Sequence, residues 1–407
     1  MIRSKGGAVI IGGAFWTPGA TVVGGTSKKT FDQLIQSLFA NNEQGFFYDP
    51  NDLSTMFQDA AGTIPVTAAG QPVGLLLDKN KGLELGVEKV VNGNFASDTA
   101  WIKAASVTMS NGSAIFNGAT GNPVLSQNVG ITPGKWYEVT INVTEVTSGV
   151  STFGIYGTGG NDTIFSISSA GIYKAMTMAR SDATGLIGFS ALLTSVKLSS
   201  VSVKELAGNH AYQTNPTSRP ILRQNAVTDA YYLEFDGADD FLRTGNIDFT
   251  ATDKVSLFAG VRKNSDAAVG ILAELSTNSD STNGTFALAA SVSGNNYYTQ
   301  SRGTVRSVQY ATGYVAPNSA VLVAEAKIST DTLRLHVNNA APLSSATDQG
   351  TGNYGNYPLY IGRRGGVAYP FNGHLYSLIG IGRLSTASEI AAIEKELAKR
   401  TGVSLNV

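Results

Sequence analysis

The chain has 407 residues, a formal net charge of −1 and no cysteine. Its length allows two or three domains, each large enough for its own hydrophobic core. The absence of cysteine excludes disulfide bonds and thiolate metal sites. Charged residues make up only 14% of the chain and form no basic stripe, and no apolar stretch is long enough to cross a membrane. We therefore expect neither a nucleic-acid partner nor a membrane span.

The N-terminal region divides into two predicted segments. Residues 1–29 are rich in glycine and lack a hydrophobic period, which predicts an extended arm. Residues 30–40 predict a short helix, with Thr30 as its N-cap, because their apolar side chains share one helical face. That face consists of Phe31, Leu34, Ile35, Leu38 and Phe39. The helix packs either on its own domain or on another subunit, and the sequence leaves both alternatives open.

The remainder of the chain predicts β-structure. Gly, Ser, Thr, Asn, Val and aromatic residues dominate, and short alternating segments are separated by turn residues. A second helix closes the chain, because Thr386 and Glu389 form a capping-box pattern and Gly402 suits a helix C-terminus. The predicted fold class is all-β, with β-sandwich domains, an extended N-terminal arm, a short N-terminal helix and a C-terminal helix.

Several long blocks of the sequence resemble, in the same order, a family of bacteriophage and prophage virion proteins. These blocks are "EQGFFYDPNDLSTMFQDAAGTIPVTAAGQPVGLLLDK", "GNHAYQTNPTSRPIL", "LEFDGADDFL", "DQGTGNYGNYPLYIGRRGG" and "PFNGHLYSLI". The resemblance implies a concanavalin A-like (laminin G-like) sandwich and a structural or appendage role in the virion. It does not imply one defined ligand.

The resemblance also indicates an insertion. Members of that family run on without a break where this chain stops at Gly82 in "LDKNKG" and resumes at Ala207 in "AGNHA". The intervening segment opens with "NGNF", continues to Trp101 and closes with "VSVKEL". It resembles a galactose-binding-like or carbohydrate-binding-module jelly roll, so the expected fold contains two β-sandwiches, one inserted in the other.

Three parts are therefore predicted. Residues 1–40 form an arm and helix for particle attachment or oligomerisation. Residues 41–82 plus 207–407 form the concanavalin A-like sandwich, and residues 83–206 form the inserted jelly roll. A domain whose ends lie close together enters a surface loop at little entropic cost. Strands that end near Val91 and Val203 should therefore be neighbours.

The densest acid cluster lies in "YYLEFDGADDFL", residues 231–242. Glu234-x-Asp236-x-x-Asp239 approaches a motif of some concanavalin A-like glucanases, and glycosidases need two carboxyl groups about 5–9.5 Å apart. Asp236, Asp239 and Asp240 could instead bind calcium, which takes about six to eight oxygen ligands. The favoured interpretation is a turn, because Asp-Gly is a strong turn signal that would carry Asp239 off the strand of Glu234.

Four aromatic residues are candidates for carbohydrate binding, because an exposed ring can stack on a sugar. They are Tyr354, Tyr357, Tyr369 and Trp136, and packing inside a sandwich is the alternative for each. The "GRRGG" segment at 362–366 could form an anion-binding nest. A hairpin tip with solvated charges is the favoured interpretation of that segment.

The expected function is a non-enzymatic structural component of a tailed bacteriophage virion, such as a decoration protein, a tail fibre or another appendage. It would contact other virion proteins through residues 1–40, bind host-surface polysaccharide and form a homo-oligomer. Its expected location is the virion, assembled in the host cytoplasm, and no cofactor other than calcium is expected. The alternative is a glycan-degrading enzyme that uses Glu234 and Asp239.

Overall fold

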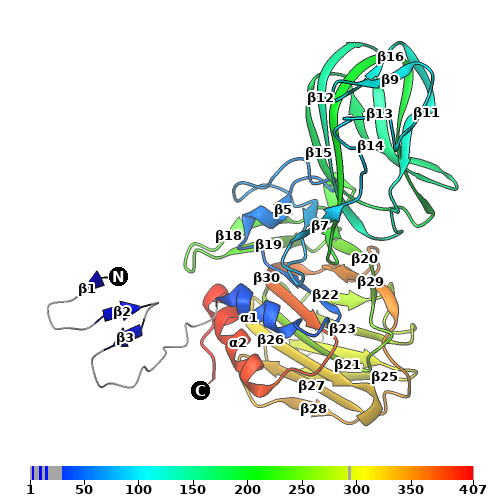
Figure 1. The fold of residues 1–407 in the computed structure, drawn as a ribbon. Helices are drawn as coiled ribbons and strands as arrows, with labels where there is room; N and C mark the ends of the chain where they lie inside the picture. Colours follow the sequence, from blue (N-terminus) through cyan, green and yellow to red (C-terminus); the bar gives the residue numbers. More distant parts are fainter. Residues whose placement is uncertain (1, 4–8, 12–13, 17–29, 292–294, 407) are drawn as a thin grey trace.

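The computed structural model describes residues 2–3, 9–11, 14–16, 30–291 and 295–406. Strands dominate these residues, and two α-helices flank them near the two ends, which confirms the predicted all-β class (Figure 1). None of the helices in these ranges is long and apolar enough to cross a membrane. Short 3₁₀ turns occur at Leu53–Thr55, Pro216–Ser218 and Ile328–Thr330.

The predicted N-terminal arm is described only in part. Three short strands, β1 (Ile2–Arg3), β2 (Val9–Ile11) and β3 (Ala14–Trp16), pair in antiparallel order. The rest of residues 1–29 lies outside the described residues.

The first sandwich consists of two antiparallel sheets. In spatial order, its nine-stranded sheet contains β25 (Arg306–Ala311), β24 (Asn296–Arg302), β23 (Thr285–Ser291), β22 (Gly270–Leu275), β29 (Asn356–Ile361), β20 (Leu242–Asp248), β17 (Ala211–Tyr212), β6 (Leu75–Leu76) and β5 (Met56–Phe57). Its eight-stranded sheet contains β18 (Ile221–Gln224), β19 (Tyr231–Asp236), β30 (Asn372–Ile381), β21 (Lys254–Lys263), β26 (Asn318–Lys327), β27 (Thr332–Val337) and β28 (Leu343–Ser345), with β4 (Gly45–Tyr48) paired to β30.

Apolar side chains from both sheets meet in one core. Leu257 and Leu322 from the eight-stranded sheet belong to the same buried cluster as Leu288 and Leu359 from the nine-stranded sheet. Strands β4 and β6, which precede residue 83, pair with β30 and β17, which follow residue 207, and β5 pairs with β6. Residues from both sides of the inserted segment therefore build one sandwich.

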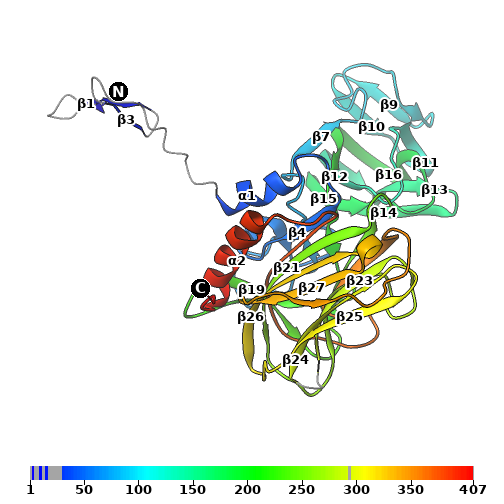
Figure 2. The same ribbon diagram turned by 90° about the horizontal axis from the view of Figure 1, so that it is seen from below.

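Two helices cover the outer face of the eight-stranded sheet (Figure 2). In α1 (Phe31–Leu38), Thr30 and Gln33 form a capping box, and Ile35 and Leu38 are buried. In α2 (Ala387–Thr401), Thr386 and Glu389 form the predicted capping box, and Gly402 takes a φ of 73° at the C-terminus. Both helices pack with sheet residues such as Phe47, Phe258 and Val323 in one apolar cluster. Helix α1 therefore packs on its own domain, and its apolar face is not available to another subunit.

The insert has its own strands and its own core. The strands are β7 (Leu85–Glu88), β8 (Ile102–Lys103), β9 (Val107–Ser110), β10 (Ser113–Phe116), β11 (Ala119–Asn128), β12 (Trp136–Ser148), β13 (Ser151–Gly157), β14 (Gly160–Ile167), β15 (Gly171–Met178) and β16 (Ala183–Leu206). Strand β16 pairs with β11 and β13 in its first half and with β12 in its second half. The pairing of β16 with β12 shifts by one residue at Ser199. Ser200 pairs with Asn142, whereas Leu198, two positions earlier, pairs with the next residue, Val143.

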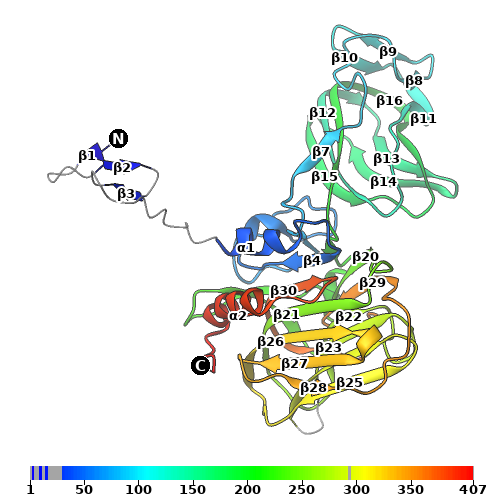
Figure 3. The same cartoon turned by 60° about the horizontal axis from the view of Figure 1, so that its bottom comes forward.

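The two ends of the insert lie together where they leave the first sandwich. Strand β7 pairs with the end of β16, and Lys89 N donates to Val203 O at 3.0 Å. The strands expected to be neighbours near Val91 and Val203 are therefore neighbours. In Figure 3 the insert stands beyond β20, away from helix α2.

Candidate functional site

The acid-rich segment after β19 is a turn that connects the two sheets. Strand β19 ends at Asp236, and Gly237 takes a φ of 77° that suits glycine. Strand β20 then begins at Leu242 in the other sheet. The predicted turn is therefore present, although it joins two sheets and not two paired strands. Asp239 lies beyond β19, as the turn interpretation required.

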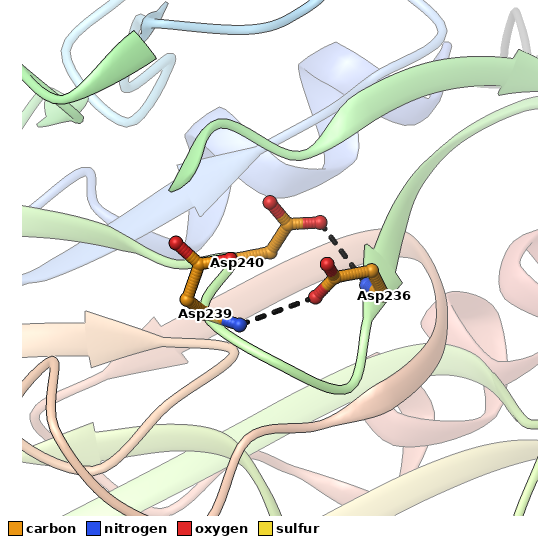
Figure 4. Close-up of side chains that lie close together, drawn as sticks. All are labelled: Asp236, Asp239 and Asp240. Atoms are coloured by element: carbon orange, nitrogen blue, oxygen red, sulfur yellow. Dashed lines mark hydrogen bonds between the residues drawn. The ribbon is translucent and has the colours of Figure 1, made fainter. Parts of the chain in front are cut away.

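The three aspartates of this turn lie side by side (Figure 4). One carboxylate oxygen from each residue lies within 4.8 Å of the other two. Asp236 Oδ1 accepts from Ala238 N at 2.8 Å and from Asp239 N at 3.3 Å, and Asp240 Oδ2 accepts from Asp236 N at 3.0 Å. These bonds show that the carboxylates of Asp236 and Asp240 cap the turn. The spacing also fits one calcium ion, because oxygens at about 2.3–2.6 Å from a shared ion lie within about 5 Å of each other.

Asp240 makes this turn sensitive to pH. Burial and, to a smaller extent, the nearby charge of Asp236 raise its pKa to about 7. A folded-state pKa above the unfolded value favours folding at low pH, and that contribution is lost as the pH rises from about 4 to about 7. Replacing Asp240 with asparagine should therefore flatten the stability profile over this range, as measured by thermal unfolding at a series of pH values.

The same measurement tests calcium. At pH 8, millimolar calcium should raise the unfolding temperature of the native chain and leave the Asp240→Asn chain unchanged. The exposed Asp229, replaced with asparagine, is the control. If calcium does not change the unfolding temperature of the native chain, the three aspartates cap the turn and do not bind calcium.

Glu234 and Asp239, the two residues of the enzyme alternative, each contact a side chain of a neighbouring segment. Glu234 lies between the core residues Leu233 and Phe235, so its side chain points outward from the eight-stranded sheet. There its Oε2 lies 2.7 Å from Arg223 Nε. Asp239 Oδ2 accepts from Ser218 Oγ at 2.6 Å. Both carboxylates therefore take part in contacts that hold neighbouring segments together.

Two of the four candidate aromatic residues are buried, which excludes both from an exposed stacking surface for glycans. Tyr354 is 1% exposed in the core of the first sandwich, with its hydroxyl 2.7 Å from Ser301 Oγ. Trp136 is 4% exposed between the two domains, where its ring centre lies 5.7 Å from that of Tyr212. Neither ring presents an open face to solvent, which stacking on a surface glycan requires.

The other two candidates differ in exposure. Tyr357 is partly buried against the core of the first sandwich. Tyr369 is 44% exposed, and the guanidinium carbon of Arg364 lies 4.8 Å from its ring centre. Arginine at this distance from an aromatic face makes a cation–π contact. Of the four candidates, Tyr369 is the one that combines an exposed ring with a fixed orientation.

Arg364 is buried, so the expectation of solvated charges in "GRRGG" is wrong for this residue. It is 6% exposed, and its Nε donates to Glu274 Oε2 at 3.0 Å. Its Nη1 bonds to Asp280. Glu274 is fully buried and also accepts from Ser279 N. The sequence contains no local signal for this network, because its carboxylates precede the arginine by more than eighty positions.

Tyr369 ends a row of side chains on the outer face of the nine-stranded sheet. Tyr310 faces Tyr298 across β25 and β24, Tyr298 faces Ala289, and Ala289 faces Ile271. Ile271 N then donates to Tyr369 O at 3.0 Å. We call Tyr310, Tyr298 and Tyr369 the tyrosine row. Tyr310 is 46% exposed and Tyr298 is 7% exposed.

Sequence reasoning missed Tyr298 and Tyr310, although a signal was present. In "NYYTQSR" and "RSVQYA" every second residue lies on the same face of a strand. Alternation alone therefore assigns Tyr298 to the face opposite Tyr297, which is fully buried in the core.

No family model and no curated protein matches the sequence. Among solved structures, the CBM40 of a Ruminococcus gnavus IT-sialidase is similar at 16% identity and a TM-score of 0.31, over 40% of this chain and 96% of that one. The Trypanosoma rangeli sialidase in complex with the inhibitor DANA is similar at 13% identity and a TM-score of 0.33, over 46% of this chain and 29% of that one. The ligand-binding domain of Botulinum neurotoxin serotype D is similar at 10% identity and a TM-score of 0.34, over 43% of this chain and 44% of that one.

Proposed function

We propose that the chain is a non-enzymatic structural component of a tailed bacteriophage virion that displays two β-sandwiches and binds host-surface glycans. The tyrosine row is the observation that carries the glycan-binding part. Its rings lie on the outer face of a sheet, and Arg364 holds the ring of Tyr369 in place. Aromatic rings supply large contact areas at low conformational cost, which suits the faces of sugar rings.

Polar groups beside the tyrosine row support the same ligand class. Arg306, whose side chain is 39% exposed, lies on this face, and its Nε donates to Oε1 of the fully buried Gln300 at 2.8 Å. The small side chain of Ala289 lies between Tyr298 and Ile271 in the row. Rings next to fixed hydrogen-bonding groups are the usual composition of a site for a ligand with both apolar faces and hydroxyl groups.

Replacing Tyr369 or Tyr310 with alanine should reduce binding to a glycan array by at least tenfold, since each change removes a stacking surface. Replacement of either residue with phenylalanine keeps the ring and should retain most of the binding. Equal thermal unfolding temperatures for all four variants would show that the fold is preserved. Undiminished binding in both alanine variants would show that the tyrosine row is not a glycan-binding surface. Release of sugar from a bound glycan that is lost in Glu234→Gln would favour the enzyme alternative.

Attachment to the particle is assigned to residues 1–29. Helix α1 is held by the first sandwich itself, which leaves this segment as the remaining part of the predicted attachment region. Its ionisable side chains are Arg3, Lys5, Lys28 and Lys29, all basic, whereas the whole chain has a net charge of −1. A basic segment before a folded domain suits an acidic surface on a partner protein.

Deletion of residues 1–29 should abolish incorporation into particles and leave a folded protein with an unchanged unfolding temperature. The physical reason is that α1, with its capping residue Thr30, remains complete in the truncated chain. Incorporation is measured by the protein composition of purified particles. A truncated chain that still assembles at the native copy number would refute the attachment role.

A further inference from the structure

The two domains meet through an apolar contact. Leu75 from the first sandwich and Trp136, Met176 and Leu206 from the insert belong to one buried cluster. Met176 N donates to Ala61 O at 2.8 Å, which links strand β15 directly to the first sandwich. The mutual orientation of the two domains is thus held by packing as well as by the chain connections.

A cleft of about 260 Å³ opens beside this contact. Both domains contribute to its walls, and none of the lining residues is charged. The lining combines aromatic rings, thioethers and hydroxyl groups. It consists of Ala60, Ala61, Trp136, Thr163, Ile164, Met176, Thr177, Met178, Tyr212 and Thr214.

Trp136 provides a second, independent observation. It is 4% exposed, and among the described residues its indole Nε1 has no hydrogen-bond partner. A buried donor without an acceptor costs about 1–3 kcal/mol, so such donors are rare in native structures. An acceptor supplied by a ligand in the cleft would remove this cost.

The cleft opens on the same side of the first sandwich as the tyrosine row. Tyr212, which lines the cleft, faces Arg243, and Arg243 faces Tyr360. The same line continues across the sheet through Glu274 and Ala287 to Gln300. Directly paired residues share one face, and Tyr298 lies two positions from Gln300 on that face. One extended ligand can therefore reach both surfaces, which are five strand spacings, or roughly 24 Å, apart.

We propose that the interdomain cleft binds one uncharged sugar ring of the glycan. The uncharged walls disfavour an acidic or basic ligand, because a buried charge without a partner is costly. The volume lies just below the range of about 300–1,000 Å³ for drug-sized ligands, which suits a single ring. Tyr212 supplies aromatic surface, the threonines supply hydroxyl groups, and a sugar oxygen accepts from the indole N–H of Trp136. This inference rests on the proposed glycan-binding function.

The test uses the full chain and saturation-transfer NMR with methyl glycosides of neutral hexoses and, in parallel, of glucuronic acid. Neutral glycosides should show saturation transfer and the charged glycoside should not. Thr214→Trp, which fills the cleft from an exposed position, should weaken binding at least tenfold. Thr108→Trp, at an exposed position of β9 outside the lining, is the matched control. Trp136→Phe, which keeps a ring and removes the N–H, should weaken binding about fivefold.

The outcomes separate the two proposals. If Thr214→Trp binds neutral glycosides as well as the native chain does, the cleft is not the sugar site. This conclusion holds whatever effect Thr214→Trp has on glycan-array binding. If glycan-array binding is then lost in Tyr369→Ala, the proposed function survives without the cleft. Neutral-sugar binding that is lost in Thr214→Trp and retained in Tyr369→Ala would establish the cleft as a separate site. Preferential binding of the glucuronide would also overturn the inference.

Discussion

Replacing Arg364 with leucine should lower the free energy of unfolding by about 3–5 kcal/mol, the usual cost of removing one partner of a buried ion pair. The reason is the position of Glu274, which is fully buried and pairs with the arginine at 3.0 Å. Without the guanidinium, this carboxylate has no compensating charge at that contact. Urea unfolding of the full chain measures the loss, and glycan binding should fall as well because Tyr369 loses the group beneath its ring.

A matched control lies in the same network. Arg306 pairs with Asp280 at 3.0 Å, but these two side chains are 39% and 38% exposed. Exposed pairs contribute about 0–1 kcal/mol, so Arg306→Leu should change stability little. The double change Arg364→Leu with Glu274→Leu should recover much of the loss, since replacing a buried pair with apolar residues is often neutral. A loss for Arg364→Leu no larger than for Arg306→Leu would contradict this account.

Replacing Asp78 with alanine should destabilise the first sandwich by at least about 3 kcal/mol, because three backbone donors lose their acceptor. Its carboxylate is fully buried and accepts from Phe47 N at 2.8 Å, Asn80 N at 2.9 Å and Asn209 N at 2.8 Å. These donors come from β4 and from the two chain segments that lead into and out of the insert. Asp78 therefore fastens the point of insertion.

Asp59→Ala is the control for this prediction. Asp59 also accepts from backbone donors, those of Thr63 and Ile64, but on a solvent-accessible loop where water can replace it. Asp59→Ala should lower the free energy of unfolding by about 1 kcal/mol or less. Trypsin should also cleave Asp78→Ala faster after Lys81 than it cleaves the native chain. Equal urea midpoints for Asp78→Ala and Asp59→Ala would show that the junction does not depend on this carboxylate.

The sequence was informative wherever a pattern has a local cause. Both helices, the capping box at Thr386 and the turn after Asp236 follow from residue period and side-chain reach over a few positions. The expectation that strands near Val91 and Val203 are neighbours also holds, because insertion requires adjacent ends.

The sequence by itself thus determined the all-β class, the two helices and the acid-rich turn. Only the tertiary structure decided which aromatic and charged groups are accessible. Tyr354 and Tyr369 lie fifteen positions apart, yet one is in the core and the other is exposed. Arg364 is buried because Glu274 and Asp280 reach it from a distant part of the chain. The physical reason is that period and capping act over a few residues, whereas burial depends on which distant segments pack together.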